Sequence, residues 1–560
     1  MSLPLKLELP LISLKEVIVI FEQFNLIIKN KPSLSKNTKK FNLIINSKDL
    51  NSYSEKKNEY KKNSFIYIAR AGKKFDGHLL AEDILNSDNY IIGNPENIKI
   101  LAFKHNYSNE KIDFILSHEN FIPVHNIEKS IYILLENQFK IEKNNFFSIG
   151  VTGTNGKTSV VQICSQILSI LSNNTNVRIG TLGIQFGSET LEGSHVTTPD
   201  YPSLLQILNL SQINNISDII MEVTSHGLME NRLGNWSIDA AIFTNLTQDH
   251  LDYHGNMENY RNAKLKLFTE ILKETGTAII CTHNSEWKEF AQKAAGSQRK
   301  LIGVGFEDNA EHFISLFDKK YKSLYYISIT NQKSSLSGVS GVLRLQNQLQ
   351  TIETAEFHAA IIGEFQFDNL LCAIAACLSK GYSLREISQT LKHIKNIPGR
   401  LEIIHSNNKN KSPTVLIDYA HSPDALEKAI QVCKKVLNQE GRGKLITVFG
   451  CGGDRDKTKR SLMGQIASSL SDEVIITSDN PRTEEPNKII DDIFAGIVNQ
   501  NHCKREVDRK KAIQLAIHSA NKFDLILVAG KGHEDYQIIG NTKYPFSDAQ
   551  IALSILHGEN

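Results

Sequence analysis

Cysteine is scarce in this chain and follows no pattern. The 560 residues include 7 cysteines, and no two of them form a C-x-x-C pair. Zinc-binding modules and small secreted domains place their cysteines at short, regular spacings. The scattered set therefore excludes a disulfide framework and a zinc-finger spacing, and it favours a reducing compartment. The cysteines are Cys164, Cys281, Cys372, Cys377, Cys433, Cys451 and Cys503.

Long apolar runs are also missing. A membrane-spanning helix needs about 18 or more uninterrupted apolar residues, and no stretch of the chain approaches that length. Residues 1–21 are apolar but are interrupted by Lys6, Glu8, Lys15 and Glu16. They lack the basic start and clean apolar core of a signal peptide. We therefore expect a cytoplasmic protein without a membrane span.

Neither sign of charge dominates the composition. The 63 Lys and Arg residues and the 61 Asp and Glu residues give a formal net charge of +2. This balance excludes a strongly basic nucleic-acid binder over the whole chain, so we expect no nucleic-acid partner. A hydrophobic fraction of 41% with 22% charged residues is typical of a globular protein. At about 150 residues per domain, the length predicts three to four domains.

The alternation of strand and helix patterns predicts an α/β fold. Residues 146–153 (FFSIGVTG) have the pattern of a buried strand and a glycine turn, and residues 157–172 place apolar side chains on one helical face. The strand patterns DIIMEV, AAIFTNL and TAIICTH follow, separated by helical stretches. Strands that alternate with helices predict a parallel sheet with crossovers. We interpret the polar run at residues 51–63, in the Asn- and Lys-rich first part of the chain, as a solvated loop.

The alternation restarts after Pro398 with the β-rich runs PTVLIDYA, KLITVFG, DEVIITS and DLILVAG. These four runs form a second α/β unit. The change of pattern at residue 146 and its restart after Pro398 predict domain boundaries near residues 145 and 397. Ligands of open α/β sheets bind beyond the carboxyl ends of the strands. Polar residues stand at each of these ends, namely Asp418 and His421, then 452–455, 479–482 and 530–534.

The sequence GVTGTNGKTS at residues 150–159 predicts a phosphate-binding loop. A strand leads into it and a helix leads out, so backbone N–H groups and the helix N-terminus would surround phosphate oxygens. Lys157 would reach the β- and γ-phosphates, and the hydroxyl of Thr158 would face Mg²⁺. The spacing is shorter than that of the common GxxxxGK[ST] loop. A tight turn with a chance Lys-Thr pair is the alternative, but the strand–loop–helix context favours an ATP site.

Acidic and imidazole groups follow the next strands at the same sheet edge. Glu222 ends the strand pattern DIIMEV, and His250 and Asp252 follow AAIFTNL. A carboxylate and an imidazole there would hold Mg²⁺ together with ATP oxygens, and the histidine makes Mn²⁺ a plausible substitute. Each residue alone could equally be a strand-end cap. Lys264 would be read as a surface lysine from its position alone.

Nine motifs then occur in a fixed order: TGTNGKTS, MEVTSHGL, TNLTQDHLDYHG, YRNAKLKLF, PGRLEII, DYAHSPDAL, FGCGGDRDKTKR, SDNPRTEEP and AGKGHEDYQ. Together they resemble the Mur ligase family, densely from residue 146 onward and more weakly before it. The resemblance implies three α/β domains. Residues 1–145 would bind the UDP part of the substrate, 146–397 would form a parallel-sheet P-loop ATPase, and 398–560 would form a Rossmann-like domain that brings the amino acid.

The resemblance also implies a reaction. The DNPR form of the loop at residues 479–482 resembles ligases that add meso-diaminopimelate, not L-lysine. The implied reaction joins this amine to UDP-MurNAc-L-Ala-D-Glu through an acyl phosphate, with conversion of ATP to ADP and phosphate. We expect a monomer that handles small-molecule substrates in peptidoglycan precursor synthesis, and therefore in cell-wall biogenesis, cell shape and division.

Site residues follow from the resemblance motif by motif. Catalytic roles are implied for Lys157, Glu222, His250 and Lys264. ATP contacts are implied for Gly153, Thr154, Asn155, Gly156, Lys157, Thr158, Ser159, Asn369, Arg400 and Asp418. Metal contacts are implied for Thr158, Glu222, His250 and Lys264, the last matching a lysine that is carbamylated in the family. Contacts with UDP-MurNAc-L-Ala-D-Glu are also implied. Around the sugar-dipeptide they involve Thr197, Thr198, Thr224, Glu230 and Arg232, and at the uridine end they involve Ser47, Lys73, Lys74 and Phe75. The diaminopimelate pocket would contain Arg455, Asp479, Asn480, Pro481, Arg482, Gly530 and Glu534.

Three departures from the family pattern stand out. Residues 46–48 read NSK where DSR is common, and Gln366 replaces an Asn in GEFQFDN. Glu230 stands where Gln is usual, so its carboxylate would need a nearby cation, for which Arg232 is the candidate. None of these changes removes a group with an implied catalytic role.

Several other functions remain open at this point. A ligase for L-lysine, or for the dipeptide of the following step, would differ at DNPR and GGDRDK. A folylpolyglutamate synthetase would lack the UDP-binding domain. A nucleotide-binding scaffold would be free to lose Lys157, Glu222, His250 or Lys264, all of which are present. A P-loop motor or GTPase switch would leave the second α/β unit unexplained.

Overall fold

The computed structural model describes residues 11–24, 26, 39–45, 65–71, 76–87, 89–191, 197–317, 321, 323–348, 350–404 and 412–558. The chain forms two compact units. The first contains Met1–Phe147, Gln185–Ile219 and His226–Ser237, and the second contains Ser148–Ile184, Ile220–Ser225 and Ile238–Asn560. Within the described residues, no helix has both the length and the apolar character needed to cross a membrane. The predicted boundaries near 145 and 397 stay a prediction.

The N-terminal part of the first unit is a small five-stranded sheet. Its order is β1 (Leu11–Ser13), β2 (Lys40–Ile44), β3 (Phe65–Ile68), β4 (Tyr90–Gly93) and β5 (Phe121–Pro123). Strands β2 to β5 are parallel, and β1 is antiparallel to β2. The short helices of this unit are α1 (Leu14–Gln23), η3 (Gly77–Leu80), α3 (Ala81–Leu85), α4 (Pro95–Lys104), α5 (Asn109–Ser117), α6 (Ile127–Phe139), η4 (Lys143–Asn145) and α8 (Tyr201–Ile213). One face of the sheet packs on α3, α4 and α5 through Ile91, Ile98 and Ile115.

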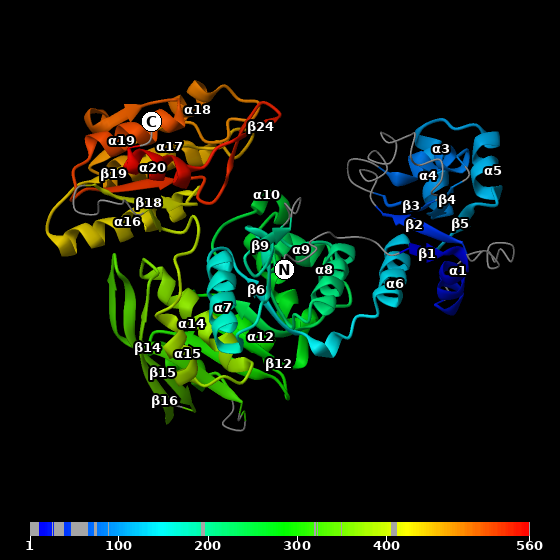
Figure 1. Cartoon of the computed structure of the whole chain (residues 1–560), viewed down its shortest axis with the longest axis horizontal. Coiled ribbons are helices and arrows are strands. Elements are labelled where there is room, and N and C mark those ends of the chain that lie inside the picture. Colours follow the sequence, from blue (N-terminus) through cyan, green and yellow to red (C-terminus); the bar gives the residue numbers. More distant parts are fainter. Residues whose placement is uncertain are drawn as a thin grey trace. The chain divides into compact units, whose positions relative to one another are not determined.

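A large sheet of eleven strands follows along the chain (Figure 1). Its order is β16-β15-β14-β13-β12-β11-β6-β10-β7-β8-β9. The bounds are β6 (Phe147–Thr152), β7 (Val177–Gly180), β8 (Gly183–Phe186), β9 (Glu189–Leu191), β10 (Asp218–Glu222), β11 (Ile238–Phe243), β12 (Leu272–Cys281), β13 (Lys300–Gly305), β14 (Leu324–Ser335), β15 (Gly338–Asn347) and β16 (Gln350–Ala359). β6 is parallel to β11, and β11 to β14 continue the parallel arrangement. The strand predictions for FFSIGVTG, DIIMEV, AAIFTNL and TAIICTH are therefore confirmed.

The helices of this middle part confirm the predicted apolar face after the phosphate loop. Helix α7 (Lys157–Ser172) buries Val160, Val161, Cys164, Ile167 and Leu168. The other helices are α9 (Ser225–Met229), α10 (Leu251–His254), α11 (Met257–Lys266), the π-helix η5 (Leu267–Ile271), α12 (Trp287–Ala294), α13 (Asp308–Ser315), α14 (Phe365–Ser379) and α15 (Leu384–Leu391). Helix α14 packs beside α7 and is buried along most of its length.

An antiparallel extension at one edge of the large sheet was not part of the prediction. β14, β15 and β16 pair antiparallel and are joined by short turns. Such turns need only a few residues, whereas parallel neighbours need a long crossover. The strand–helix alternation therefore gives no sign of these hairpins.

The strand–helix alternation predicted after Pro398 forms a separate, six-stranded sheet. This sheet has the order β17 (Glu402–Ile404), β18 (Thr414–Asp418), β22 (Leu525–Ala529), β19 (Leu445–Phe449), β20 (Glu473–Ile476) and β21 (Cys503–Arg505). All neighbours are parallel except β17 and β18. Helices α16 (Pro423–Glu440), α17 (Thr458–Leu470) and α18 (Pro486–Phe494) contribute to one core, and α19 (Arg509–Ser519) and α20 (Asp548–His557) to another. The hairpin β23 (Tyr536–Ile539) and β24 (Thr542–Pro545) precedes α20, and η6 (Gln500–His502) precedes β21.

Candidate active site

The phosphate loop connects β6 to α7 and depends on two glycines. Gly153 and Gly156 have φ of +149° and +87°. A Cβ on Gly153 would lie 1.9 Å from the Thr244 hydroxyl oxygen, and a Cβ on Gly156 would lie 2.4 Å from the Asn369 Oδ1. Only glycine fits both positions, because backbone conformation and space each exclude a side chain. Gly156 also caps α7 without a side-chain hydrogen bond, so no capping side chain covers the first turn of the helix.

The loop is held by the segment that follows β11. The N–H groups of Thr154 and Asn155 donate to the carbonyl and the side-chain oxygen of Asn245, each at 2.9 Å. The Thr244 hydroxyl donates to the carbonyl of Asn155 at 2.6 Å. These bonds fix the loop conformation from a neighbouring strand end. The phosphate site is therefore preorganised by residues outside its own motif.

Two lysines converge on the loop. The ammonium of Lys157 donates to the carbonyls of Gly153 and Thr154, each at 2.8 Å, and Lys264 donates to the same Gly153 carbonyl at 2.8 Å. Burial lowers the pKa of both lysines, and for Lys264 the nearby charge of Lys157 lowers it further. Lys264 is 1% exposed, which corrects its reading as a surface residue from position alone. The amines of Lys157 and Lys264 therefore meet at the phosphate loop.

Glu222 ends β10 and is 1% exposed. The hydroxyl of Thr158 donates to its Oε1 at 2.9 Å, and the N–H and hydroxyl of Thr181 donate to its two oxygens at 2.8 and 3.1 Å. Arg400 also reaches the Thr158 hydroxyl at 3.3 Å. The structure thus brings together a hydroxyl and a carboxylate, the oxygen donors that Mg²⁺ prefers.

His250 lies at the start of α10 with φ of +52°. Its backbone N–H donates to the Asp249 carboxylate, and its ring lies 6.2 Å from that of Tyr260. The same tyrosine ring lies 4.4 Å from the Lys264 nitrogen, and its hydroxyl is 3.3 Å from the Thr154 hydroxyl. Tyr260 therefore links the histidine loop, Lys264 and the phosphate loop. The described residues contain no group of three or more His, Cys, Asp or Glu side chains placed to hold a metal.

Two aromatic or imidazole groups of this region were missed from sequence. His254 is buried and lies 2.9 Å from the Ser225 hydroxyl, and Tyr260 has the contacts described above. The motif TNLTQDHLDYHG contains two histidines. Choosing between them requires the turn geometry, because His254 faces the core while His250 is half exposed.

Asn369, Arg400 and Asp418, which have implied contacts with the rest of the ATP molecule, each make different contacts within the protein. Asn369 is buried beside Gly156 and donates to Gln366 at 2.9 Å, so the unusual glutamine holds the amide in place. Arg400 stacks over Tyr419 at 4.9 Å. Burial raises the pKa of Asp418, whose carboxylate accepts from the N–H groups of Leu401 and Ala420, each at 2.8 Å. In this arrangement Asp418 fixes the local backbone, and its contact with ribose stays a prediction.

Of the residues expected to contact UDP-MurNAc-L-Ala-D-Glu, the structure describes those around the sugar-dipeptide but not those at the uridine end. Arg232 donates to the Thr198 carbonyl at 2.8 Å and to the Glu230 carboxylate at 3.0 and 2.7 Å. The cation that Glu230 would need is therefore present, as the sequence suggested. Thr197 lies one residue before Thr198 in the first compact unit, and Thr224 follows β10 in the second. Ser47, Lys73, Lys74 and Phe75 lie outside the described residues.

The predicted amino-acid pocket gathers on the carboxyl ends of β19, β20 and β22. Asn480 donates to the Glu534 carboxylate at 2.8 Å, and the Asp479 carboxylate would meet a Cβ on Gly530 at 2.7 Å. Arg482 donates to the Gly453 carbonyl at 2.8 Å. Pro481 is buried, and Arg455 is exposed in the loop after β19. The predicted set is therefore brought to one edge of the sheet.

Two residues of this pocket were missed from sequence. Lys531 is fully buried and donates to Glu534 at 2.9 Å and to Asn480 at 3.3 Å. Gln537 in β23 donates to the Asp479 carbonyl at 2.7 Å. The hairpin β23–β24 also receives the N–H of Arg482 at the Ile538 carbonyl, at 3.1 Å. Lys531 and Gln537 both stand inside the motif AGKGHEDYQ, so the position of each residue was a usable signal.

Comparison with known proteins agrees with this geometry. Residues 151–377 match the model of the Mur ligase middle domain, and residues 399–532 match that of the Mur ligase, glutamate ligase domain. A relative from Fusobacterium nucleatum, named UDP-N-acetylmuramoyl-L-alanyl-D-glutamate–2,6-diaminopimelate ligase, is 35% identical over 88% of this chain and 91% of its own length. A relative of the same name from Rickettsia bellii is 40% identical over 72% of this chain and 79% of its own.

A solved structure extends the likeness to the whole chain. It is titled as a UDP-N-acetylmuramoyl-L-alanyl-D-glutamate–2,6-diaminopimelate ligase and superposes with a TM-score of 0.60 at 25% identity, covering 98% of this chain and 99% of its own. The two family matches include the phosphate loop, Glu222, Lys264 and the pocket residues up to Gly530. This chain belongs to the Mur ligase family, whose members carry out ATP-dependent peptide ligation in peptidoglycan synthesis.

Proposed function

We propose that this ligase joins meso-2,6-diaminopimelate to UDP-MurNAc-L-Ala-D-Glu, with conversion of ATP to ADP and phosphate. The observation that carries the amine assignment is the pocket at the ends of β20 and β22. Arg482 is positioned there together with Asp479, Asn480 and Glu534. An amino acid with a carboxylate and an ammonium at each end needs both kinds of partner. The names of the two relatives describe the same amine.

The chemistry follows from the poor leaving group of a carboxylate. A carboxylate oxygen of the sugar-dipeptide attacks the γ-phosphorus of ATP, an acyl phosphate forms, and ADP leaves. The neutral amine then attacks the acyl carbon, and the tetrahedral intermediate releases phosphate while the new amide loses a proton. The protein positions the substrates and stabilises developing charge. In this chain the α7 N-terminus and Lys157 would hold the phosphates, and no covalent protein nucleophile is required.

The donor set fits a hard divalent cation. The Thr158 hydroxyl and the Glu222 carboxylate are adjacent oxygen donors, and His250 and a carbamylated Lys264 would complete the site. Mg²⁺ bound there would neutralise phosphate oxygens, and Mn²⁺ is the expected substitute because of the histidine. Carbamylation by CO₂ would convert the amine of Lys264 into an anionic oxygen donor, the kind of ligand that Mg²⁺ prefers. The low pKa of Lys264 favours the neutral amine that attacks CO₂.

The remaining substrate contacts belong to the same proposal. Thr197, Thr198, Glu230 and Arg232 would face the sugar-dipeptide with Thr224, and Asn369, Arg400 and Asp418 would surround the nucleoside of ATP. Arg232 compensates the charge of Glu230, so an anionic substrate does not meet an isolated carboxylate. We place the enzyme in the cytoplasm as a monomer that acts on small-molecule precursors of the cell wall.

Phosphate release from ATP tests the proposal. The assay contains UDP-MurNAc-L-Ala-D-Glu and Mg²⁺ and compares meso-diaminopimelate with L-lysine. We expect turnover with meso-diaminopimelate alone. Turnover with L-lysine would keep the ligase reaction and overturn the amine assignment. The absence of turnover with both amines, in protein that binds ATP, would overturn the proposed reaction and favour a nucleotide-binding scaffold or a different acceptor.

A further inference from the structure

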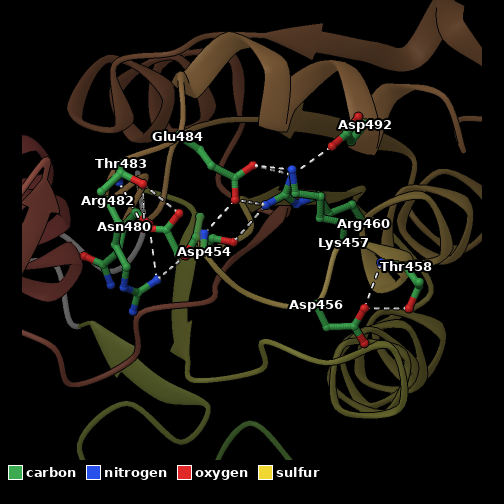
Figure 2. Close-up of polar contacts among 12 residues, drawn as sticks. Asp454, Asp456, Lys457, Thr458, Arg460, Asn480, Arg482, Thr483, Glu484 and Asp492 are labelled. Atoms are coloured by element: carbon green, nitrogen blue, oxygen red, sulfur yellow. Dashed lines mark hydrogen bonds and ion pairs between the residues drawn. The ribbon is translucent and has the colours of Figure 1, made fainter. Parts of the chain in front are cut away.

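Arg460 is a buried cation that the proposed reaction leaves without a role. It lies in the first turn of α17, within the basic sequence KTKR, yet it is only 1% exposed. Its guanidinium donates to both oxygens of Glu484 at 3.1 and 2.9 Å, to Asp492 at 2.8 Å and to the Gly452 carbonyl at 3.3 Å (Figure 2). It therefore joins the loop after β19, at residues 450–457, to the loop after β20, at residues 477–485.

These two loops also exchange side chains directly. The Asp454 N–H, in the first loop, donates to the Glu484 carboxylate of the second loop at 2.6 Å. In return, the N–H and hydroxyl of Thr483 donate to the Asp454 carboxylate, at 3.1 Å and at 2.8 and 3.0 Å. We call Asp454, Arg460, Thr483 and Glu484 the loop clamp. Figure 2 shows its members facing one another between the two loops.

Two members of the clamp are sequence neighbours of the two arginines of the proposed amine pocket. Arg455 follows Asp454, and Arg482 precedes Thr483. Asp454 and Arg482 have φ of +53° and +52°, a left-handed conformation that is strained for a residue with a side chain. Such conformations persist only where surrounding contacts determine them. The clamp supplies those contacts, so it sets the backbone from which both arginine side chains leave.

The charges of the clamp are permanently paired. The hydrogen bonds from Arg460, followed by that from the Asp454 N–H, lower the pKa of Glu484 to about 2. The carboxylate therefore stays ionised at every pH at which the enzyme would work. Ion-paired guanidinium–carboxylate forks have a fixed geometry as well as a favourable energy. This geometry suits a device that holds two loops at a constant separation.

We propose that the loop clamp is a positioning and specificity-determining device of the amine site, an inference that rests on the proposed function. A substrate with a carboxylate at both ends is recognised only if two cationic groups stand at a fixed separation. L-Lysine carries one carboxylate and does not require that separation. Loosening the clamp should therefore weaken binding of meso-diaminopimelate and reduce its preference over L-lysine, while ATP and the sugar-dipeptide bind as before.

The test uses Glu484→Gln and Thr483→Val with Asp456→Asn as the matched control. Asp456 lies in the first loop beside Arg455, and its carboxylate accepts from the N–H and the hydroxyl of Thr458, the first residue of α17, at 2.9 and 2.7 Å. The substitution Asp456→Asn removes one negative charge, as Glu484→Gln does, but it changes no contact with the second loop. Thr483 is exposed, so Thr483→Val loses only the hydrogen bonds from its hydroxyl to Asp454 and should fold. It therefore still tests the clamp if Glu484→Gln fails to fold.

We expect the two clamp variants to raise KM for meso-diaminopimelate roughly tenfold, the effect of losing about 1.4 kcal/mol. The ratio of kcat/KM for meso-diaminopimelate to that for L-lysine should fall, while KM for ATP and for UDP-MurNAc-L-Ala-D-Glu stays constant. Asp456→Asn should leave all of these unchanged. Titration calorimetry of the amine on each variant gives the same comparison without turnover.

Two results would overturn the inference. In the first, the clamp variants keep the wild-type amine KM and preference. In the second, all three substrate KM values rise in parallel with loss of thermal stability, which marks a purely structural role. If the wild type turns over L-lysine instead, the proposed amine is wrong, and the clamp inference, which depends on a substrate with a carboxylate at both ends, fails with it. If the wild type binds neither amine, the proposed function and the clamp inference fail together.

Discussion

Lys264 shows how far a single residue departs from what its local sequence indicates. The motif YRNAKLKLF places it on a helix with no special pattern, and only the family resemblance drew attention to it. The fold buries it on the phosphate loop, where Lys157 shares its hydrogen-bond acceptor. Burial and this neighbour lower its pKa, so the neutral amine is present at a lower pH than for an exposed lysine.

We predict that Lys264 is carbamylated near neutral pH and that Lys264→Arg loses activity by about 10²-fold or more, the usual effect of removing a charge-stabilising group. The guanidinium stays protonated and cannot take up CO₂. ¹³C-Labelled bicarbonate should give a carbamate signal in wild-type NMR spectra that is absent from the variant. Because only the neutral amine reacts, this signal should weaken as pH falls through the lysine pKa.

Lys266→Arg is the control for this prediction. It lies on the same helix, is partly exposed and is paired with Glu270 at 3.6 Å. Ion pairs of this kind contribute about 0.3–0.5 kcal/mol, so activity and the carbamate signal should remain. Full activity of Lys264→Arg, or a carbamate signal that persists in it, would contradict the prediction.

At the scale of elements, the phosphate loop is defined by backbone conformation and by its neighbours together. Gly156 and Gly441 both have positive φ, at +87° and +68°. A Cβ on Gly156 would meet Asn369, whereas a Cβ on Gly441 at the end of α16 would meet nothing within 4 Å. The pair therefore separates backbone strain from steric collision.

We predict that Gly156→Ala loses most of its ATP affinity, while Gly441→Ala keeps it. Both variants carry a left-handed alanine, which costs about 1–2 kcal/mol of stability. Only Gly156→Ala also displaces Asn369 and the first turn of α7. Nucleotide titration and chemical denaturation of both variants check this. Equal ATP affinity in the two proteins would show that the contact with Asn369 does not shape the site.

The elements also mark what a single sequence can predict. The central strand patterns DIIMEV and AAIFTNL were predictable because their apolar runs end in polar residues, and β10 and β11 confirm them. The hairpins β14–β16 were not, because neither crossover length nor helix alternation marks them. The pairing of Arg460 with Glu484 was also beyond reach, since it joins two loops whose strands are neighbours only in the folded sheet.

At the scale of the whole molecule, the proposed reaction uses groups from two different sheets. The phosphate loop and Glu222 belong to the eleven-stranded sheet, and the amine pocket belongs to the six-stranded one. The acyl phosphate forms where ATP is held, and the amine must reach its carbonyl carbon. Reacting atoms have to approach to about 3–3.5 Å before a bond can form. The motifs predict the order of the domains, whereas the reacting arrangement is a property of the liganded chain.

We predict that ATP and the sugar-dipeptide together make the enzyme more compact, because closure would bring the two sites together and exclude water from the acyl phosphate. Small-angle scattering should then show a smaller radius of gyration with both substrates than with neither. Gly156→Ala, which should not hold ATP, serves as the control and should show no such decrease. A wild-type radius that stays constant with ATP, the sugar-dipeptide and the amine all present would contradict closure. The sites would then have to meet without any change in overall dimensions.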